Sequence, residues 1–148
     1  MSDGSDERRS DVRENSAPVD FDRLGIVAER LSGDERFARV ANPPEFAPDR
    51  VVCRYDSGYY PPRVEDARLE IVWYENGDFS IHYHETHEHG SFDHRWDRHS
   101  STHNNRDHVH PGPDAPTPGR DASFPTGWRD VLRLVLSEVE DRQRAFWG

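Results

Sequence analysis

Histidine is the residue type whose placement in this sequence most directly suggests chemistry. All nine histidines lie between His82 and His110, and the rest of the 148 residues contain none. Imidazole titrates nearest neutrality and can both accept and donate protons. Arginine and aspartate are interleaved with these histidines; arginine can hold a phosphate with two parallel hydrogen bonds, and aspartate can fix an imidazole tautomer. The stretch therefore contains the side chains that acid–base chemistry on a phosphate ester needs.

Strands with alternating side chains must position this set. Leu69 to Tyr74 runs into Asn76-Gly77, a strong hairpin signal, and a second strand is expected from Phe79 to His87. A two-residue turn at His89-Gly90 then leads into a third strand, Ser91 to His99. This turn pairs Tyr83 with Trp96, His84 with Arg95, His82 with Asp97 and Ser80 with His99.

The expected register separates apolar from polar side chains, because successive residues of a strand point to opposite faces. One face gathers Phe79, Ile81, Tyr83, Phe92 and Trp96. The other face gathers the histidines with arginine and aspartate. Arg98 and His94 fit less well, since they fall on the apolar side.

Two helices complete the expected fold. Leu24, Val27 and Leu31 have helical spacing, with Asp20 or Asp22 as the cap and Ser32-Gly33 as the stop. A longer helix from about Thr126 to Phe146 covers the apolar face of the sheet and leaves the polar face open. The fold class is α+β: an antiparallel meander of three to five strands packed on the C-terminal helix, with a short N-terminal helix.

The remaining segments are assigned as follows. Val51 to Tyr55 is a possible fourth strand, Phe37 to Val40 is ambiguous, and Thr102 to Pro118 is a loop whose only strand-like piece is His108 to His110. Residues 1–18 are expected to be a disordered acidic leader and residues 19–148 a single domain.

Composition limits the cellular setting. The 19 basic residues are all arginine, and 29 acidic residues bring the formal charge to −10, which suits a halophilic cytoplasm or reflects a GC-rich genome. Salt near 1 M shortens the Debye length to about 3 Å, so the acidic balance does not exclude RNA as a substrate. Cys53 is the single cysteine and is expected to be a buried small hydrophobe, so no disulfide or thiolate zinc site is expected. No apolar run has membrane-spanning length, and we expect a cytoplasmic protein with no membrane partner.

The expected catalytic set is His82, His84, Arg95, Asp97, His99, His108 and His110. In metal-independent cleavage of RNA, His82 or His99 would be the general base and His108 or His110 the general acid. Arg95 would stabilise the phosphorane, and Asp97 would orient a neighbouring imidazole. No cofactor is expected in this interpretation. An ordinary polar sheet face, whose charged pairs add tenths of a kcal/mol, is the competing interpretation.

Two further alternatives remain open from the residues alone. Histidines two apart on one strand point the same way and can share a cation, as in His82/His84, His87/His89 and His108/His110. A zinc- or nickel-binding protein is therefore one alternative, although the spacing matches no closed zinc motif. A non-catalytic interaction module whose histidines respond to pH is the other.

The run from Phe92 to Asp114 resembles the TumE family of toxin components of type II toxin–antitoxin systems. The similarity rests on Phe-Asp-His-Arg-Trp-Asp-Arg-His, a polar loop, and His-Val-His-Pro-Gly-Pro-Asp-Ala. It departs from the commoner form at Val109, where a lysine is usual, and in its extra histidines His87, His89 and His103. The resemblance implies a toxin acting on RNA and a cognate antitoxin, typically a helix-turn-helix protein; a homodimer is a further option. Its matching residues are Arg95, Asp97, His99, His108 and His110.

Overall fold

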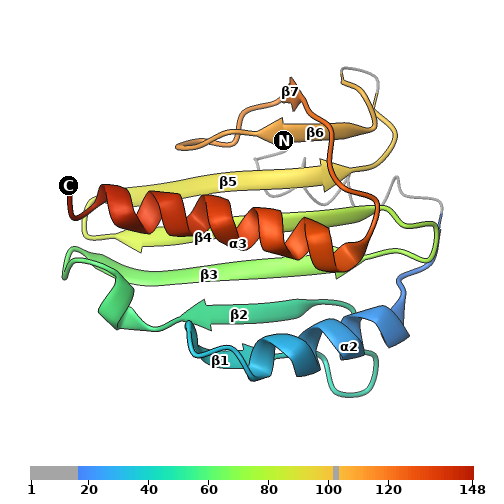
Figure 1. The fold of residues 1–148 in the computed structure, drawn as a ribbon, viewed down its shortest axis with the longest axis horizontal. Coiled ribbons are helices and arrows are strands. Elements are labelled where there is room, and N and C mark those ends of the chain that lie inside the picture. Colours follow the sequence, from blue (N-terminus) through green and yellow to red (C-terminus); the bar gives the residue numbers. More distant parts are fainter. Residues whose placement is uncertain (1–16, 102–103) are drawn as a thin grey trace, which may run out of the picture.

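A single antiparallel sheet with two helices on one of its faces makes up the described part of the chain, residues 17–101 and 104–148 of a computed structural model (Figure 1). The helices are α2 (Phe21–Ser32) and α3 (Trp128–Ala145), with a short 3₁₀ turn η1 (Ser57–Tyr59). The strands are β1 (Phe37–Ala41), β2 (Val51–Tyr55), β3 (Val64–Trp73), β4 (Phe79–His87), β5 (Gly90–Arg98), β6 (Asp107–His110) and β7 (Arg120–Asp121). The leader predicted for residues 1–18 falls almost wholly outside the described residues, as does His103.

The sheet is a meander in which each strand pairs with the next, in the order β1 to β7. The α+β class is confirmed, but the predicted count of three to five strands is too low. The ambiguous segment at Phe37 is β1, and the strand-like piece at His108 is β6. The two-residue strand β7 is too short for alternation to reveal it.

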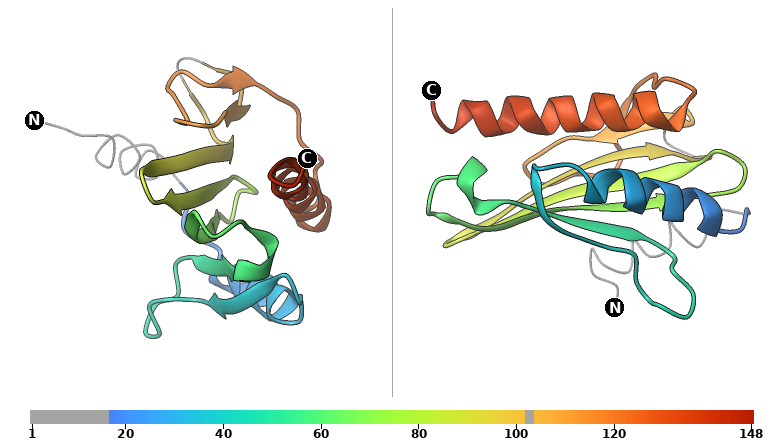
Figure 2. Two further views of the ribbon diagram at one scale, coloured as in Figure 1. Left: turned by 90° about the vertical axis from the view of Figure 1, so that its left-hand side faces the viewer. Right: turned by 60° about the horizontal axis from the view of Figure 1, so that its bottom comes forward.

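Both helices pack on the same face of the sheet (Figures 1 and 2). The side chain of Asp20 caps α2 by accepting a hydrogen bond from the backbone N–H of Arg23, as predicted. Leu24, Val27 and Leu31 of α2 and the apolar positions of α3 enter one core with alternate residues of the strands. The opposite face carries Ser80, His82, His84, Asp93, Arg95, Asp97, His108 and His110, and we call it the open face. Among the described residues, no helix combines the length and apolar character needed to cross a bilayer.

The register of the β4–β5 hairpin differs from the expected one by two residues. His87 pairs with Gly90, so the turn is Glu88-His89 and not His89-Gly90. The expected pairs are therefore wrong: His84 lies opposite Asp93, His82 opposite Arg95, Ser80 opposite Asp97, and Tyr83 opposite His94. A shift of two residues leaves every side chain on its predicted face, so alternation alone cannot distinguish the two registers.

His94 and Arg98 do lie on the helix side, and each is accommodated there by local partners. The His94 ring packs on Trp96 at 4.5 Å between ring centroids, and its Nδ1 accepts a hydrogen bond from the backbone N–H of Gly112. Arg98 lies over the Phe79 ring and forms an ion pair with Asp107. Arg98 is thus paired on the apolar side, whereas His94 has one bonded ring nitrogen, and its buried Nε2 has no hydrogen-bond partner among the described residues.

A buried carboxylate joins α3 to the sheet. Glu85 is 0% exposed, and its two oxygens accept hydrogen bonds from Arg142 at 2.9 and 2.8 Å. The Tyr83 hydroxyl also donates to Glu85, at 2.5 Å, and His87 Nε2 lies 2.6 Å from its other oxygen. Burial raises the pKa of Glu85, but the hydrogen bonds from Arg142 and Tyr83 outweigh it and leave the pKa below its ordinary value. Glu85 therefore remains charged in the core.

Replacing Arg142 by methionine is expected to lower the free energy of unfolding by about 3 kcal/mol, because a buried carboxylate then loses its cation. Urea unfolding monitored by circular dichroism measures the change. The matched control is Arg144→Met on the same helix, where an exposed pair with Glu140 and Asp141 is lost and the cost stays below about 1 kcal/mol. Equal losses in the two variants would contradict a special role for Glu85.

Candidate functional site

Three neighbouring strands bring the predicted site residues together on the open face. Arg95 of β5 pairs with His82 of β4 on one side and with His110 of β6 on the other. Asp97 pairs in the same way with Ser80 and His108. Since α3 packs on the other face, these side chains share one surface, as the sequence predicts. They form two groups, each built around a carboxylate.

The first group, called the Asp97 cluster, comprises Arg95, Asp97, His99, His108 and His110. Arg95 donates to Asp97 Oδ2 from Nε at 3.1 Å and from Nη2 at 2.8 Å, and the Ser80 hydroxyl donates to Oδ1 at 2.9 Å. The Nε2 atoms of His110, His99 and His108 lie 3.2, 3.7 and 3.8 Å from the same Oδ2. Three imidazoles therefore converge on one oxygen atom.

Backbone carbonyls fix the orientation of these imidazoles. Nδ1 of His108 lies 3.0 Å from the carbonyl oxygen of Asn105, and Nδ1 of His110 lies 2.8 Å from that of Pro116. Nδ1 of His99 lies 2.9 Å from the carbonyl oxygen of Ser100. A carbonyl only accepts hydrogen bonds, so each Nδ1 carries a proton and each Nε2 is directed toward Asp97.

The second group, called the Asp93 cluster, comprises His82, His84 and Asp93. His82 Nε2 and His84 Nδ1 each lie 2.7 Å from Asp93 Oδ1, within ordinary hydrogen-bond length. The two rings are 6.0 Å apart between centroids. Their side chains are 10% and 20% exposed, so this part of the open face is the more accessible one.

The electrostatics of both carboxylates favour the charged form. Burial raises the pKa of Asp97, but the neighbouring rings of His110 and His99 together with the charge of Arg95 place that pKa well below its ordinary value. Burial likewise raises the pKa of Asp93, and the hydrogen bonds from His82 and His84 reverse the effect and lower it. Burial lowers the pKa of His108, and Asp97 offsets only part of this shift. A neutral His108 therefore faces a charged Asp97.

Two connections close over the Asp97 cluster. The Asn104 side chain donates to the carbonyl of Gly119 at 2.8 Å and accepts from its backbone N–H at 2.9 Å. A Cβ atom on Gly119 would lie 2.5 Å from the carbonyl oxygen of Val109, so only glycine permits this close approach. As a result Asp97 is 0% exposed, His108 1% and His110 3%.

Among the described residues, the remaining histidines of the sequence, His87, His89 and His94, belong to neither group. His87 bonds to Glu85 and packs on Phe146, whereas His89 is 95% exposed in the turn. The pair His87/His89 therefore offers no shared cation position. Arg106, in the loop before β6, forms an ion pair with Asp78.

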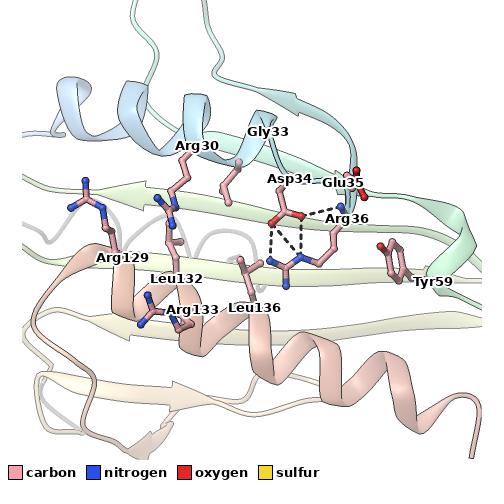
Figure 3. A pocket seen from close by; sticks show the side chains of 11 residues that line it. Arg30, Gly33, Asp34, Glu35, Arg36, Tyr59, Arg129, Leu132, Arg133 and Leu136 are labelled. Carbon is pink, nitrogen blue, oxygen red and sulfur yellow. Dashed lines mark hydrogen bonds and ion pairs between the residues drawn. The ribbon is translucent and has the colours of Figure 1, made fainter.

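A separate hollow of about 700 Å³ lies between α2 and α3, on the helix side (Figure 3). Its lining includes Leu31, Leu132 and Leu136 with Arg30, Arg129 and Arg133, and Asp34 is paired with Arg36 at its edge. None of the histidines that the structure describes lines this hollow, which is distinct from the open face.

Asp93 is the functional residue that the sequence interpretation missed. It lies in β5 with the same parity as Arg95 and Asp97, so alternation alone would have placed it on the open face. The expected register put Arg95, and not Asp93, opposite His84. Its role as the link between two imidazoles depends on the shifted register.

Comparison with known families matches this chain to the family described as "Toxin TumE" over residues 27–143. This range covers well over half of the chain and includes both clusters. The protein is thus a toxin component of a toxin–antitoxin system, and it belongs to the TumE family. An antitoxin partner follows from that membership. Neither a curated protein nor a solved structure gives a significant match.

Replacing Asp93 by asparagine is expected to destabilise the fold at pH 7 more than at pH 3. The folded-state pKa of Asp93 is lowered, so its charge stabilises the fold above the unfolded value of about 3.9. That contribution is lost as the pH falls through the folded value. Urea unfolding at the two pH values measures the difference. Asp114→Asn, at an exposed position, should change stability by less than about 0.5 kcal/mol at both; a loss for Asp93→Asn that is independent of pH would contradict the expectation.

Proposed function

We propose that this toxin cleaves RNA by metal-independent acid–base chemistry on the open face. The observation that supports this most is the Asp93 cluster, in which one carboxylate holds two accessible imidazoles 6.0 Å apart. Arg95, a permanent cation, lies directly across the ladder from His82. Two proton-transfer groups beside a cation are what transesterification of a phosphodiester requires.

The reaction has a defined course. One imidazole takes the proton of the ribose 2′-hydroxyl, and the 2′-oxygen attacks phosphorus. The bond from phosphorus to the 5′-oxygen breaks, and the second imidazole protonates that oxygen. The products are a 2′,3′-cyclic phosphate end and a 5′-hydroxyl end.

We assign the general base to His82 and the general acid to His84. The sequence suggested His82 or His99 as base and His108 or His110 as acid. In the structure His108 and His110 are 1% and 3% exposed beneath the 104–106 and 116–119 segments, whereas the His84 side chain is 20% exposed. Arg95 stabilises the charge on the phosphorane, and Asp97 orients Arg95 through two hydrogen bonds.

The partner and the cellular setting complete the proposal. We infer that the cognate antitoxin carries a helix-turn-helix domain and that the toxin meets its RNA target in the cytoplasm. A small helix-turn-helix gene adjacent to this one, whose product co-purifies with the toxin, is the expected finding.

Incubating the purified protein with total cellular RNA tests the proposal. Fragments with 2′,3′-cyclic phosphate ends are expected in the presence of EDTA, with the fold verified by circular dichroism. His82→Gln and His84→Gln should each reduce the cleavage rate by about 10²- to 10⁴-fold, the usual contribution of one acid–base group. His87→Gln/His89→Gln is the matched control and should retain the rate, because neither ring lies in the Asp93 cluster.

Three results would count against the mechanism. Full activity in His82→Gln and His84→Gln would remove the acid–base pair. Loss of cleavage on EDTA addition, with the fold retained, would favour a catalytic metal. No cleavage of any RNA would favour a non-catalytic interaction module.

A further inference from the structure

The spacing of ligand atoms separates the two clusters into different kinds of site. In the Asp93 cluster, nitrogen and oxygen atoms are 2.7 Å apart, which is hydrogen-bond length. In the Asp97 cluster the three Nε2 atoms stand 3.2, 3.7 and 3.8 Å from Oδ2. Tetrahedral zinc with ligand bonds of about 2.0–2.1 Å separates its ligand atoms by roughly 3.3 Å. The separations of 3.7 and 3.8 Å are too long for direct hydrogen bonds and fit ligands around a cation, whereas the 3.2 Å separation of His110 Nε2 fits either arrangement.

Hydrogen bonding within the Asp97 cluster supports the same interpretation. His110 is 3% exposed, and its Nε2 has no hydrogen-bond partner in the described part of the chain, although Asp97 Oδ2 lies only 3.2 Å away. With Nδ1 bonded to a backbone carbonyl, Nε2 presents a lone pair toward a carboxylate oxygen. Two electron-rich atoms at that distance repel each other unless a positive charge lies between them.

The hydrogen-bond partners of the Asp97 cluster hold its side chains in the way that metal ligands are usually held. Metal-binding histidines usually donate their second ring N–H to a carbonyl or carboxylate, and ligating carboxylates are themselves hydrogen-bonded. Carbonyls of Ser100, Asn105 and Pro116 hold the three rings, and Arg95 and Ser80 hold Asp97.

We propose that Asp97, His99, His108 and His110 bind one divalent transition-metal ion, with zinc as the cation best suited to three imidazoles and a carboxylate. Asp97, His99 and His108 have ligand atoms within 4.8 Å of one another. We assign His110 as the fourth ligand because its Nε2 lies 3.2 Å from Asp97 Oδ2. Four protein ligands with little exposure make a closed site, the form that structural zinc sites take. Such an ion links His99, just after β5, to His108 and His110 of β6, a structural role separate from the proposed acid–base chemistry at Asp93.

Metal binding by the full-length, untagged protein tests this proposal. After removal of metal with a chelator, native mass spectrometry in the presence of Zn²⁺ should show one tightly bound ion per chain. Zinc at about 100 times its Kd should raise the Tm by roughly 5–10 °C. Co²⁺ in its place should give the intense visible absorption of tetrahedral coordination.

Variants locate the ion. His108→Gln and His110→Gln should each weaken zinc binding by more than about 100-fold, since even outer partners of ligands contribute 10- to 100-fold. His99→Gln, at the edge of the cluster, provides the same test if the buried variants do not fold. Two controls should bind normally: His82→Gln/His84→Gln, which alters the other carboxylate cluster, and His87→Ala/His89→Ala, which removes two histidines outside both clusters.

The results that would contradict the zinc site differ from those that would contradict RNA cleavage. Zinc binding lost in His82→Gln/His84→Gln but kept in His108→Gln would place the ion at Asp93. Loss in His87→Ala/His89→Ala would show surface capture only. Absence of tight binding by the wild-type chain would mean that protonated imidazoles, and not a cation, face Asp97. Only the first of these results would also contradict the proposed RNA cleavage by His82 and His84.

Discussion

The buried carboxylate of Asp97 is the interaction on which the open face depends. A charge with 0% exposure is stable only when hydrogen bonds and opposite charges surround it; Arg95 and Ser80 provide hydrogen bonds, and three imidazoles are directed at the same carboxylate. These partners come from β4, β5, β6 and the segment after β5, so satisfying one side chain fixes the relative position of four parts of the chain. The same requirement draws the 104–106 and 116–119 segments over the cluster.

The helix side of the sheet also contains a buried charge that must be compensated. Apolar side chains of β2 to β5 are covered by α2 and α3, while Glu85 carries a charge into that core and is compensated by Arg142. Covering one face only is what leaves the histidine face available for chemistry (Figure 2). In this way the positions of the helices decide which face of the sheet is left open.

Much of the site follows from alternation along the strands. The parity of His82, His84, Arg95 and Asp97 predicted a shared face, and the terminal histidines His108 and His110 join it through β6. The register could not be predicted from alternation, because moving a hairpin turn by two residues leaves every side chain on the same face of the sheet. Which carboxylate meets which imidazole is decided by that register, so the pairing of Asp93 with His84 required the structure. The strands β1 and β7 were likewise hidden, since short strands carry little periodic signal.

The protonation state of the three converging imidazoles is the most direct test of this account. Long-range ¹H–¹⁵N NMR of histidine-labelled protein distinguishes protonated from unprotonated ring nitrogens. For His99, His108 and His110 the account predicts a protonated Nδ1, bonded to its backbone carbonyl, and an unprotonated Nε2 directed at Asp97. Nε2-protonated tautomers with a bare Nδ1 at these three positions would contradict the hydrogen bonds from Nδ1 to the backbone carbonyls and would leave no lone pairs for a cation.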